Sequence, residues 1–217
     1  MSDAVRAVVV AAHPTVRRVV EIACQEAGVI VVDSSGTAAE ATAACRSHGP
    51  ELLVLDLDLP DADGFRVLAD LGDLRPRSIL VLAERADGDH VLQALRLGAR
   101  GYLTKAGGLR DLGTTIRRVI AGERVMTPKL EKDAIGALGR MARHAREGAD
   151  LAESLTTRQQ QVLEFLCQGK TVNQIASRLG ISPRTVETHV ATLYRRLGVN
   201  TRVQAVSQAA RLGLVDL

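Results

Sequence analysis

Five short apolar runs lie in the first half of the chain, and each has the length of a β-strand. They occupy residues 5–12, 29–33, 52–57, 78–83 and 101–104. The first run is continuous and rich in valine, which is too apolar for a strand with one face in water. Helix-length patterns follow each run, at residues 14–27, 37–48, 64–71, 88–98 and 109–122. The pattern therefore predicts strand and helix alternating five times.

This alternation is typical of a parallel sheet covered by helices on both faces. Ligands of such sheets bind at the carboxyl ends of the strands. The residues expected there are Ala11, Ala12 and His13 after the first strand, Asp56 after the third, Ala83 after the fourth, and Thr104 and Lys105 after the fifth. The segment 106–108 is interpreted as a plain turn into the fifth helix.

A helical segment is predicted after this α/β region. Thr127 and Pro128 form a typical helix start, and an apolar stripe continues to residue 146, where Glu147 and Gly148 are expected to end it. The stripe consists of Leu130, Ala134, Leu138, Met141 and Ala145. It is expected to pack on a domain or on its own copy in a dimer. The predicted division is therefore a domain at residues 1–124, a helical linker at 125–153 and a second domain at 154–217.

Four helices are predicted in the last region, the first of them capped by Thr156. The third is the most informative, because Ser182 caps it and Pro183 occupies its first position. One face is apolar and consists of Val186, Val190, Leu193 and Leu197. The other carries Arg184, Glu187, Thr188, Ala191 and Arg195. Such a helix suits the major groove of DNA, although the same pattern also describes an ordinary amphipathic surface helix.

The charge is unevenly distributed between these regions. Residues 1–124 contain 15 Lys and Arg against 17 Asp and Glu, residues 125–153 contain 5 against 5, and residues 154–217 contain 8 against 3. A basic final region is expected if it binds a polyanion. Cys24, Cys45 and Cys167 are far apart and lack metal-ligand spacing, so we expect free thiols, no metal and no cofactor. Without a membrane-length apolar run or a signal-peptide pattern, the chain is expected to be cytoplasmic.

The first region resembles the receiver domain of bacterial response regulators. LLVLDLDLPDADG matches the family's third strand and following loop, with Asp56 at the phospho-acceptor position. GARGYLTK matches the fifth strand, with Tyr102 at the switch aromatic and Lys105 at the family's lysine. The resemblance implies a flavodoxin-like (βα)5 domain.

The departures from this family lie in the phosphorylation pocket. Ala11 and Ala12 replace the acidic pair that helps to hold Mg²⁺, and Ala83 replaces the Thr or Ser that meets the phosphoryl group. Mg²⁺ requires several oxygen ligands, and phosphorylating Asp56 would place about two negative charges in a pocket without a metal or a switch hydroxyl. We therefore expect phosphotransfer to be absent or very inefficient, and Lys105 to pair directly with Asp56.

The last region resembles the LuxR-type DNA-binding domain of the NarL/FixJ subfamily, an all-α helix-turn-helix fold. The matching segments are LTTRQQQVL, GKTVNQIASRLGIS, RTVETHVATLYRRLGV and RVQAV. Gln159 and Gln161 replace the family's usual Glu, which is expected to remove charge-assisted bonds near the first helix.

The resemblance also assigns roles by position. Residues expected to face base edges are Glu187, Thr188 and Ala191. Those expected to contact phosphates are Thr171, Arg184, Thr185, Thr192, Arg195 and Arg196. Those expected to contact a twofold-related copy are Thr201, Val203, Gln204, Ser207 and Gln208.

The first hypothesis is therefore a dimeric, non-enzymatic transcription regulator that binds double-stranded DNA and whose receiver works without phosphorylation. In a second hypothesis the receiver senses a small molecule or a protein partner. A third makes the receiver a module that sequesters a kinase or another regulator, and a fourth keeps Asp56 as a conventional phospho-acceptor.

Overall fold

A computed structural model describes residues 4–85, 87–109 and 111–215. Its contacts divide the chain into two compact units, Met1–Leu138 and Gly139–Leu217. We call these the N-terminal unit and the C-terminal unit. The division falls within the segment predicted as a linker.

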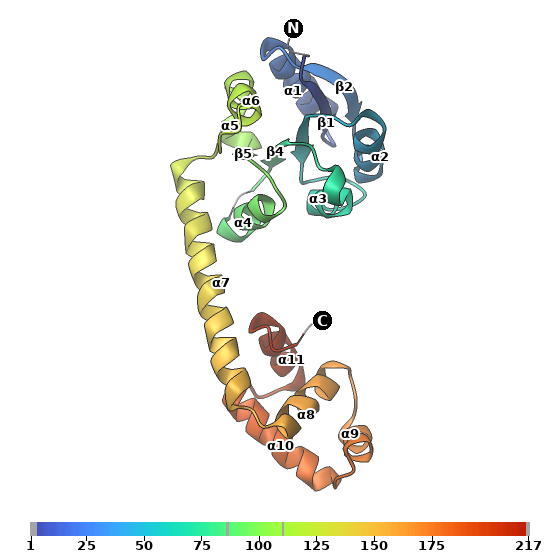
Figure 1. Cartoon of the computed structure of the whole chain (residues 1–217), viewed down its shortest axis with the longest axis vertical. Coiled ribbons are helices and arrows are strands. Elements are labelled where there is room, and N and C mark those ends of the chain that lie inside the picture. The colour runs from blue at the N-terminus through green and yellow to red at the C-terminus, as the bar shows by residue number, and fades with distance from the viewer. Residues whose placement is uncertain (1–3, 86, 110, 216–217) are drawn as a thin grey trace. The chain divides into compact units, whose positions relative to one another are not determined.

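A five-stranded parallel sheet forms the centre of the N-terminal unit (Figure 1). The strands are β1 (Arg6–Val10), β2 (Ile30–Ser35), β3 (Leu52–Asp56), β4 (Ser78–Ala83) and β5 (Gly101–Thr104), in the order β2-β1-β3-β4-β5. β3 and β4 are buried along their whole length, as their continuous apolar sequences predict. The predicted flavodoxin-like sheet is confirmed.

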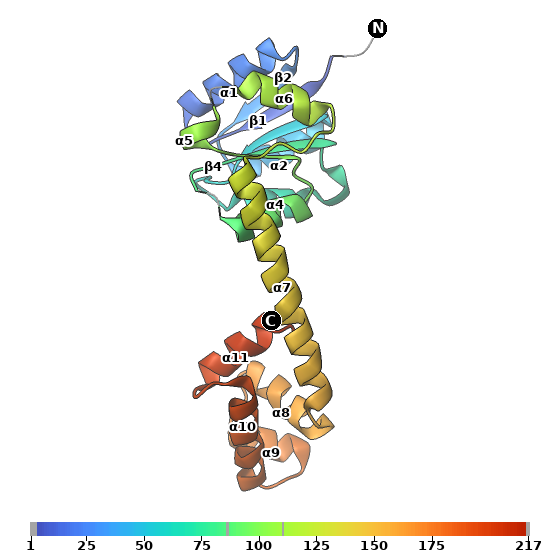
Figure 2. The same ribbon diagram turned by 90° about the vertical axis from the view of Figure 1, so that its left-hand side faces the viewer.

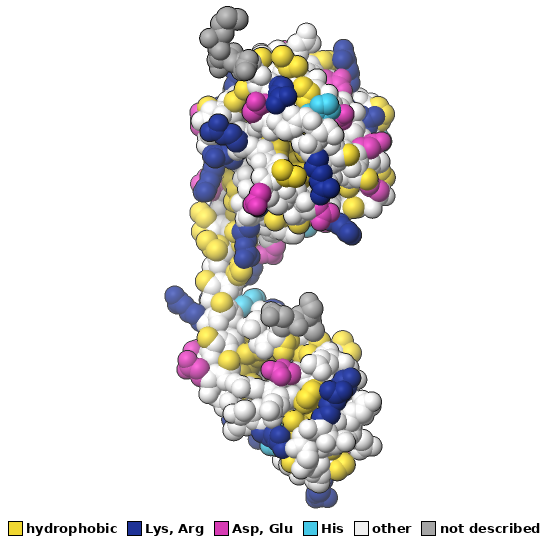
Figure 3. All heavy atoms as spheres, turned by 45° about the vertical axis from the view of Figure 1, so that its right-hand side comes forward, with side chains coloured by type: hydrophobic (Ala, Val, Ile, Leu, Met, Phe, Trp, Pro, Cys, Tyr) yellow, Lys and Arg dark blue, Asp and Glu magenta, His cyan; other side chains and the backbone are white. Residues whose placement is uncertain are grey.

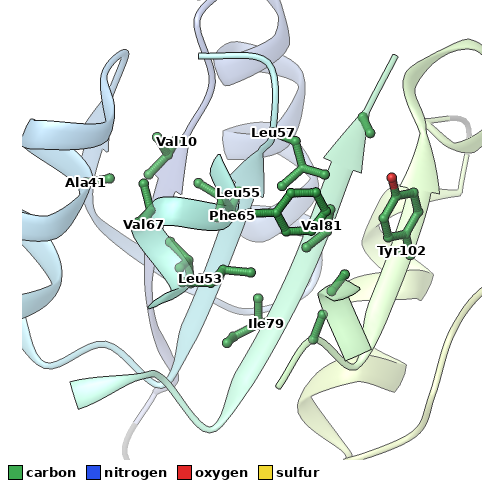
Figure 4. Packing of buried hydrophobic residues seen from close by; sticks show 14 of the residues in the cluster. Val10, Ala41, Leu53, Leu55, Leu57, Phe65, Val67, Ile79, Val81 and Tyr102 are labelled. Carbon is green, nitrogen blue, oxygen red and sulfur yellow. The ribbon is translucent and has the colours of Figure 1, made fainter. Parts of the chain in front are cut away.

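Helices cover both faces of this sheet (Figure 2). α1 (Pro14–Glu26) and α6 (Leu112–Ile120) pack on one face. On the other lie α2 (Ala38–His48), α3 (Gly64–Leu71), the 3-10 turn η1 (Gly72–Leu74) and α4 (Gly88–Arg96). Figure 4 shows Phe65 of α3 beside Leu57 and Val81, with Tyr102 on the neighbouring strand. Each face therefore has its own apolar core.

The segment after β5 differs from the prediction. Residues 106–108 were interpreted as a turn, but they belong to the short helix α5 (Lys105–Gly108), and α6 begins only at Leu112. A single helical turn is too short to leave an apolar repeat, so periodicity could not show it. Val125 extends the sheet edge beyond β5, since it accepts a bond from the Tyr102 amide (2.9 Å) and donates one to the carbonyl of Arg100 (2.8 Å).

The predicted linker helix is longer than expected. α7 runs from Pro128 to Ser154, so the expected end at Glu147 and Gly148 is wrong. Gly148 is buried, and a Cβ at this position would overlap the carbonyl of Leu212. The glycine therefore permits close packing within the C-terminal unit and does not terminate the helix.

The apolar stripe of α7 divides into two parts. Leu130 and Ala134 are buried and join the core beside α4. Leu138 and Met141 remain exposed, as does Ile135. Hydrophobic side chains are accordingly visible on the surface of α7 in Figure 3. The first part of the stripe therefore packs on the N-terminal unit.

Four helices follow in the C-terminal unit, as predicted: α8 (Thr157–Cys167), α9 (Val172–Leu179), α10 (Pro183–Leu197) and α11 (Arg202–Arg211). Their core includes Val162, Ile175, Val186, Leu193 and Ala205. The expected weakening at Gln159 is compensated locally, because its side-chain oxygen accepts the Thr156 amide (3.1 Å) and completes a capping box.

Candidate functional site

Asp56 and Lys105 form an ion pair at the carboxyl edge of the sheet. Asp56 ends β3 with only 1% of its side chain exposed, and Lys105 directly follows β5. Lys105 Nζ lies 2.8 Å from Asp56 Oδ1, which also accepts the amide of Asp58 (3.0 Å). This confirms the direct pairing predicted from the sequence.

Burial and charge act in opposite directions on this pair. Burial raises the pKa of Asp56, although the hydrogen bond and charge of Lys105 oppose the rise. Burial by itself would lower the pKa of Lys105, but its bonds to carboxylates, that to Asp56 first, raise it above its ordinary value. Lys105 is thus held as a cation, and Asp56 depends on it for compensation.

Two further carboxylates contact the same ammonium group. Lys105 Nζ donates to Asp58 Oδ2 and to Glu84 Oε1, each at 3.2 Å. Asp58 Oδ2 also accepts the amide of Glu84 (2.9 Å). We name Asp56, Asp58, Glu84 and Lys105 the acidic cluster; it has three carboxyl groups around one cation. Sequence reasoning missed Glu84 and assigned no side-chain role to Asp58; the only signal was their position just beyond β3 and β4.

The residues in this pocket do not fit the Mg²⁺ of a conventional receiver. Ala11 and Ala12 offer methyl groups where the family has carboxylates, and Lys105 already binds the Asp58 carboxylate. The carbonyl oxygens of Ala11 and Ala12 accept hydrogen bonds from Arg17 Nη1 (2.6 and 3.1 Å), so a guanidinium lies against the end of β1. Among the residues that the structure describes, no group of three or more His, Cys, Asp or Glu side chains could hold a metal ion.

Ala83 and Tyr102 lie next to this cluster and are almost completely buried. The Tyr102 hydroxyl donates to the carbonyl of Arg85 (3.2 Å), and burial raises the pKa of Tyr102 to about 12. The pocket residues predicted from the sequence are therefore gathered at one edge of the sheet.

The third helix of the C-terminal unit, α10, has the two faces that its sequence predicts. Val186, Leu193 and Leu197 are buried in the core. The exposed positions are Arg184, Thr185, Glu187, Thr188, Ala191, Arg195 and Arg196. Ser182 caps the helix by accepting the Thr185 amide (3.1 Å), and Gly180 in the left-handed region ends α9 before the turn. A helix-turn-helix therefore presents a polar face to solvent.

Comparisons with known proteins agree with both halves of this description. Residues 7–117 match the response regulator receiver domain, and residues 153–209 match the bacterial regulatory proteins of the luxR family. The probable transcriptional regulatory protein NarL of Mycobacterium tuberculosis is 32% identical over 99% of this chain and 97% of its own length. The chain is a response regulator of the NarL/FixJ subfamily. It is accordingly a DNA-binding transcription regulator.

Other relatives of this response regulator support the same assignment. The DNA-binding transcriptional activator DevR/DosR of M. tuberculosis is 32% identical over 92% of this chain and 91% of its own length. A crystal structure of a LuxR-family two-component response regulator from Aurantimonas sp. SI85-9A1 is 28% identical with a TM-score of 0.54, covering 62% of this chain and 98% of that one. In the described part of the chain, no helix is long and apolar enough to cross a membrane.

Several of the side chains predicted to contact phosphates are hydrogen-bonded within the protein. Arg196 Nη1 donates to the carbonyl and the hydroxyl of Ser154, at the end of α7. The Thr171 hydroxyl caps α9 by accepting the Gln174 amide (3.3 Å). Thr192 is half-buried and donates to the carbonyl of Thr188 (3.0 Å). The Thr171–Gln174 pair follows the Thr-x-x-Gln pattern of a capping box, which the sequence shows, whereas no local pattern indicates the partner of Arg196.

The predicted dimer residues lie on and before α11. Thr201 caps this helix, and the Gln204 side-chain oxygen accepts the amides of Asn200 and Thr201, each at 3.1 Å. Val203 is 80% exposed, which is unusual for an apolar residue in a helix. Val203, Gln204, Ser207 and Gln208 line one shallow depression of the surface. The structure therefore groups Val203, Gln204, Ser207 and Gln208 on one surface patch, which we call the α11 patch, and Thr201 is not part of it.

Proposed function

We propose that this response regulator binds DNA as a homodimer and that its receiver works without phosphorylation of Asp56. The acidic cluster is the observation that carries this proposal. Asp56 is buried, its Oδ1 atom is bound by Lys105, and the side chains of Ala11, Ala12 and Ala83 supply no oxygen to a metal or a phosphoryl group.

Electrostatics oppose a phosphoryl group at this position. Phosphorylation would replace the single negative charge of Asp56 by about two, next to Asp58 and Glu84. Two like charges about 5 Å apart repel by about 3 kcal/mol at an effective dielectric constant of about 20. A conventional receiver offsets this cost with Mg²⁺, for which the oxygen ligands are missing here. Lys105, which contacts Asp56 directly, is already shared with Asp58 and Glu84.

The proposal is tested by incubating the full chain with acetyl phosphate and MgCl₂ and measuring its intact mass. We expect no phosphoryl adduct on the native protein. A variant carrying Ala11→Asp, Ala12→Asp and Ala83→Thr, which restores the missing oxygens, is the matched comparison and is expected to gain the adduct. Stoichiometric labelling of the native protein that disappears in Asp56→Asn would overturn the proposal.

For the DNA complex, we propose that α10 enters the major groove with Glu187, Thr188 and Ala191 towards the base edges. All three are exposed on one face of the helix. A carboxylate at Glu187 can accept from the N4 amino group of cytosine, and the methyl group of Thr188 can pack on that of thymine. Arg184, Thr185 and Arg195 would contact phosphates, which fix the position of the domain without reading sequence.

Replacing Arg195 with alanine should weaken binding to all duplexes by a similar factor. Arg195 is exposed near the end of α10, where a guanidinium can neutralise one phosphate. We expect the slope of log affinity against log salt concentration to fall by about one. Fluorescence anisotropy at several salt concentrations measures it. Arg211→Ala removes the same charge from an exposed position on α11 and should leave the slope unchanged; equal effects of both variants would exclude the assigned contact.

The α11 patch is proposed as the dimer contact of the C-terminal unit. An exposed valine flanked by amide and hydroxyl side chains can be covered by its own copy across a twofold axis. Val203→Asp would place two carboxylates opposite each other and should reduce DNA affinity at least about tenfold while shifting sedimentation towards the monomer. Leu74→Asp, at a comparably apolar exposed site in the N-terminal unit, is the control. If Val203→Asp left both sedimentation and DNA affinity unchanged, the α11 patch would not be the dimer contact.

A further inference from the structure

A cavity of about 390 Å³ lies beside the acidic cluster in the N-terminal unit. It lies beyond the ends of β3 and β4, beside Tyr102 of β5 and the first turns of α3 and α4. Its apolar lining consists of Leu57, Phe65, Ala83 and Tyr102, and its polar lining includes Asp58, Asp63 and Glu84. The volume is within the range that binds small molecules.

Three aromatic rings lie at this cavity, of which His90 is exposed while Phe65 and Tyr102 are buried beneath it. The rings of Phe65 and His90 are parallel, with an interplanar angle of 3° and centroids 5.9 Å apart. Tyr102 comes from the adjacent strand, and its hydroxyl is already bound to the carbonyl of Arg85. The neighbourhood of Phe65, Leu57, Val81 and Tyr102 is visible in Figure 4. Such a lining favours a planar ring.

Ala83 contributes space to the cavity. It ends β4 and lines the cavity with a single methyl group, where the receiver family has a larger hydroxyl side chain. A β-branched residue here would project into the same volume. The substitution that weakens the case for phosphate chemistry therefore also enlarges a binding space.

The polar part of the cavity has an excess of negative charge. Three carboxylates line it, those of Asp58, Asp63 and Glu84. The lining contains one permanent positive charge, that of Arg85. The lining residue His90 is bound by the carboxylate of Asp87 (2.8 Å), and the pKa of Asp87 is lowered, chiefly by the His90 backbone amide. Lys105 binds Asp58 and Glu84 but is shared with Asp56. A cationic group is therefore favoured and an anionic one is repelled.

We propose that this cavity binds an aromatic cation, a planar ring that carries a protonated amine or amidine. The ring would lie on His90, the aromatic lining residue that is exposed, over the buried Phe65 and Tyr102, and the cationic group would lie towards Asp58, Asp63 and Glu84. The ligand cation would compete with Lys105 for two carboxylates, so binding would alter the contacts of Lys105 with Asp56. This inference rests on the proposed function, because it requires Asp56 and Lys105 to remain paired without a phosphoryl group.

Benzamidinium chloride is a suitable probe, titrated into the ¹⁵N-labelled full chain and followed by backbone amide shifts. We expect saturable shifts centred on Phe65, Ala83, Glu84 and Tyr102. Benzamide, a neutral molecule of the same shape, should bind at least about tenfold more weakly, and benzoate should not bind, because a charge-assisted bond is lost or reversed. Ala83→Leu should abolish the shifts by filling the cavity.

Glu84→Gln keeps the size of the side chain and removes one charge, so it tests the cavity even if Ala83→Leu does not fold. It should weaken benzamidinium binding several-fold and leave benzamide binding unchanged. Absence of saturable shifts at these amides, or equal binding of benzoate, would overturn the proposal. Its failure is distinguishable from failure of the proposed function, because phosphoryl labelling of Asp56 is measured separately by mass.

Discussion

Replacement of Lys105 by methionine is expected to lower the free energy of unfolding of the N-terminal unit by about 3 kcal/mol at neutral pH. Asp56 is 1% exposed and would lose Lys105, the cation bound to it in the described structure, although the Asp58 amide would still bind Oδ1. Removing one partner of a buried ion pair leaves an uncompensated charge, which costs more than the pair itself contributes. Urea denaturation at pH 7 measures the loss.

The pH dependence of this variant identifies the cause. Without Lys105, burial would raise the pKa of Asp56 further above its unfolded value. The native state then binds more protons, so stability is lost as the pH rises from about 4 through the folded pKa. The deficit of Lys105→Met should therefore shrink towards acid pH and be largely removed by adding Asp56→Asn. Lys129→Met, at an exposed position, should have little effect; a deficit independent of pH would show that Lys105 acts only by packing.

Leu193→Ala is expected to destabilise the C-terminal unit by about 3–5 kcal/mol and to weaken DNA binding. Leu193 is fully buried at the centre of the core that supports α10. Such a truncation costs about 3–5 kcal/mol, and a domain of this size is stable by only about 4–12 kcal/mol. Thermal unfolding should show an early transition of the C-terminal unit while the N-terminal unit keeps its own.

Leu74→Ala removes the same atoms from an exposed position and is the matched control for this prediction. This variant should bind the duplex with native affinity, and its C-terminal unit should unfold at the same temperature as in the native protein. Native DNA affinity of Leu193→Ala at 25 °C would show that packing of Leu193 in this core is not needed to position α10.

The parts of the fold that could be predicted from sequence are those with a strong repeating pattern. β3 and β4 are continuous apolar runs because the sheet buries both of their faces. The bounds of α10 were predicted correctly, because Ser182 and Pro183 mark its start and the apolar face runs to Leu197. α5 was missed because four residues carry no period, and the end of α7 was misplaced because Gly148 packs against Leu212.

The candidate site was predictable only where a motif covers it. The pairing of Lys105 with Asp56 followed from the receiver resemblance, and the structure contains it. The carboxylates of Asp58 and Glu84 lie beyond the ends of β3 and β4. Side chains there do not alternate as in a strand, so their contact with Lys105 could not be predicted from a repeating pattern. The bond of Arg17 to the carbonyls of Ala11 and Ala12 depends on how α1 returns over β1, which no local pattern encodes.

The central claim is that DNA affinity does not depend on a phosphoryl group at Asp56. The direct measurement uses a duplex selected from genomic fragments and compares its affinity for the full chain before and after treatment with acetyl phosphate and MgCl₂. We predict the same Kd under both conditions, and the same value for Asp56→Asn. A change of about tenfold or more upon treatment that is absent in Asp56→Asn would contradict the account.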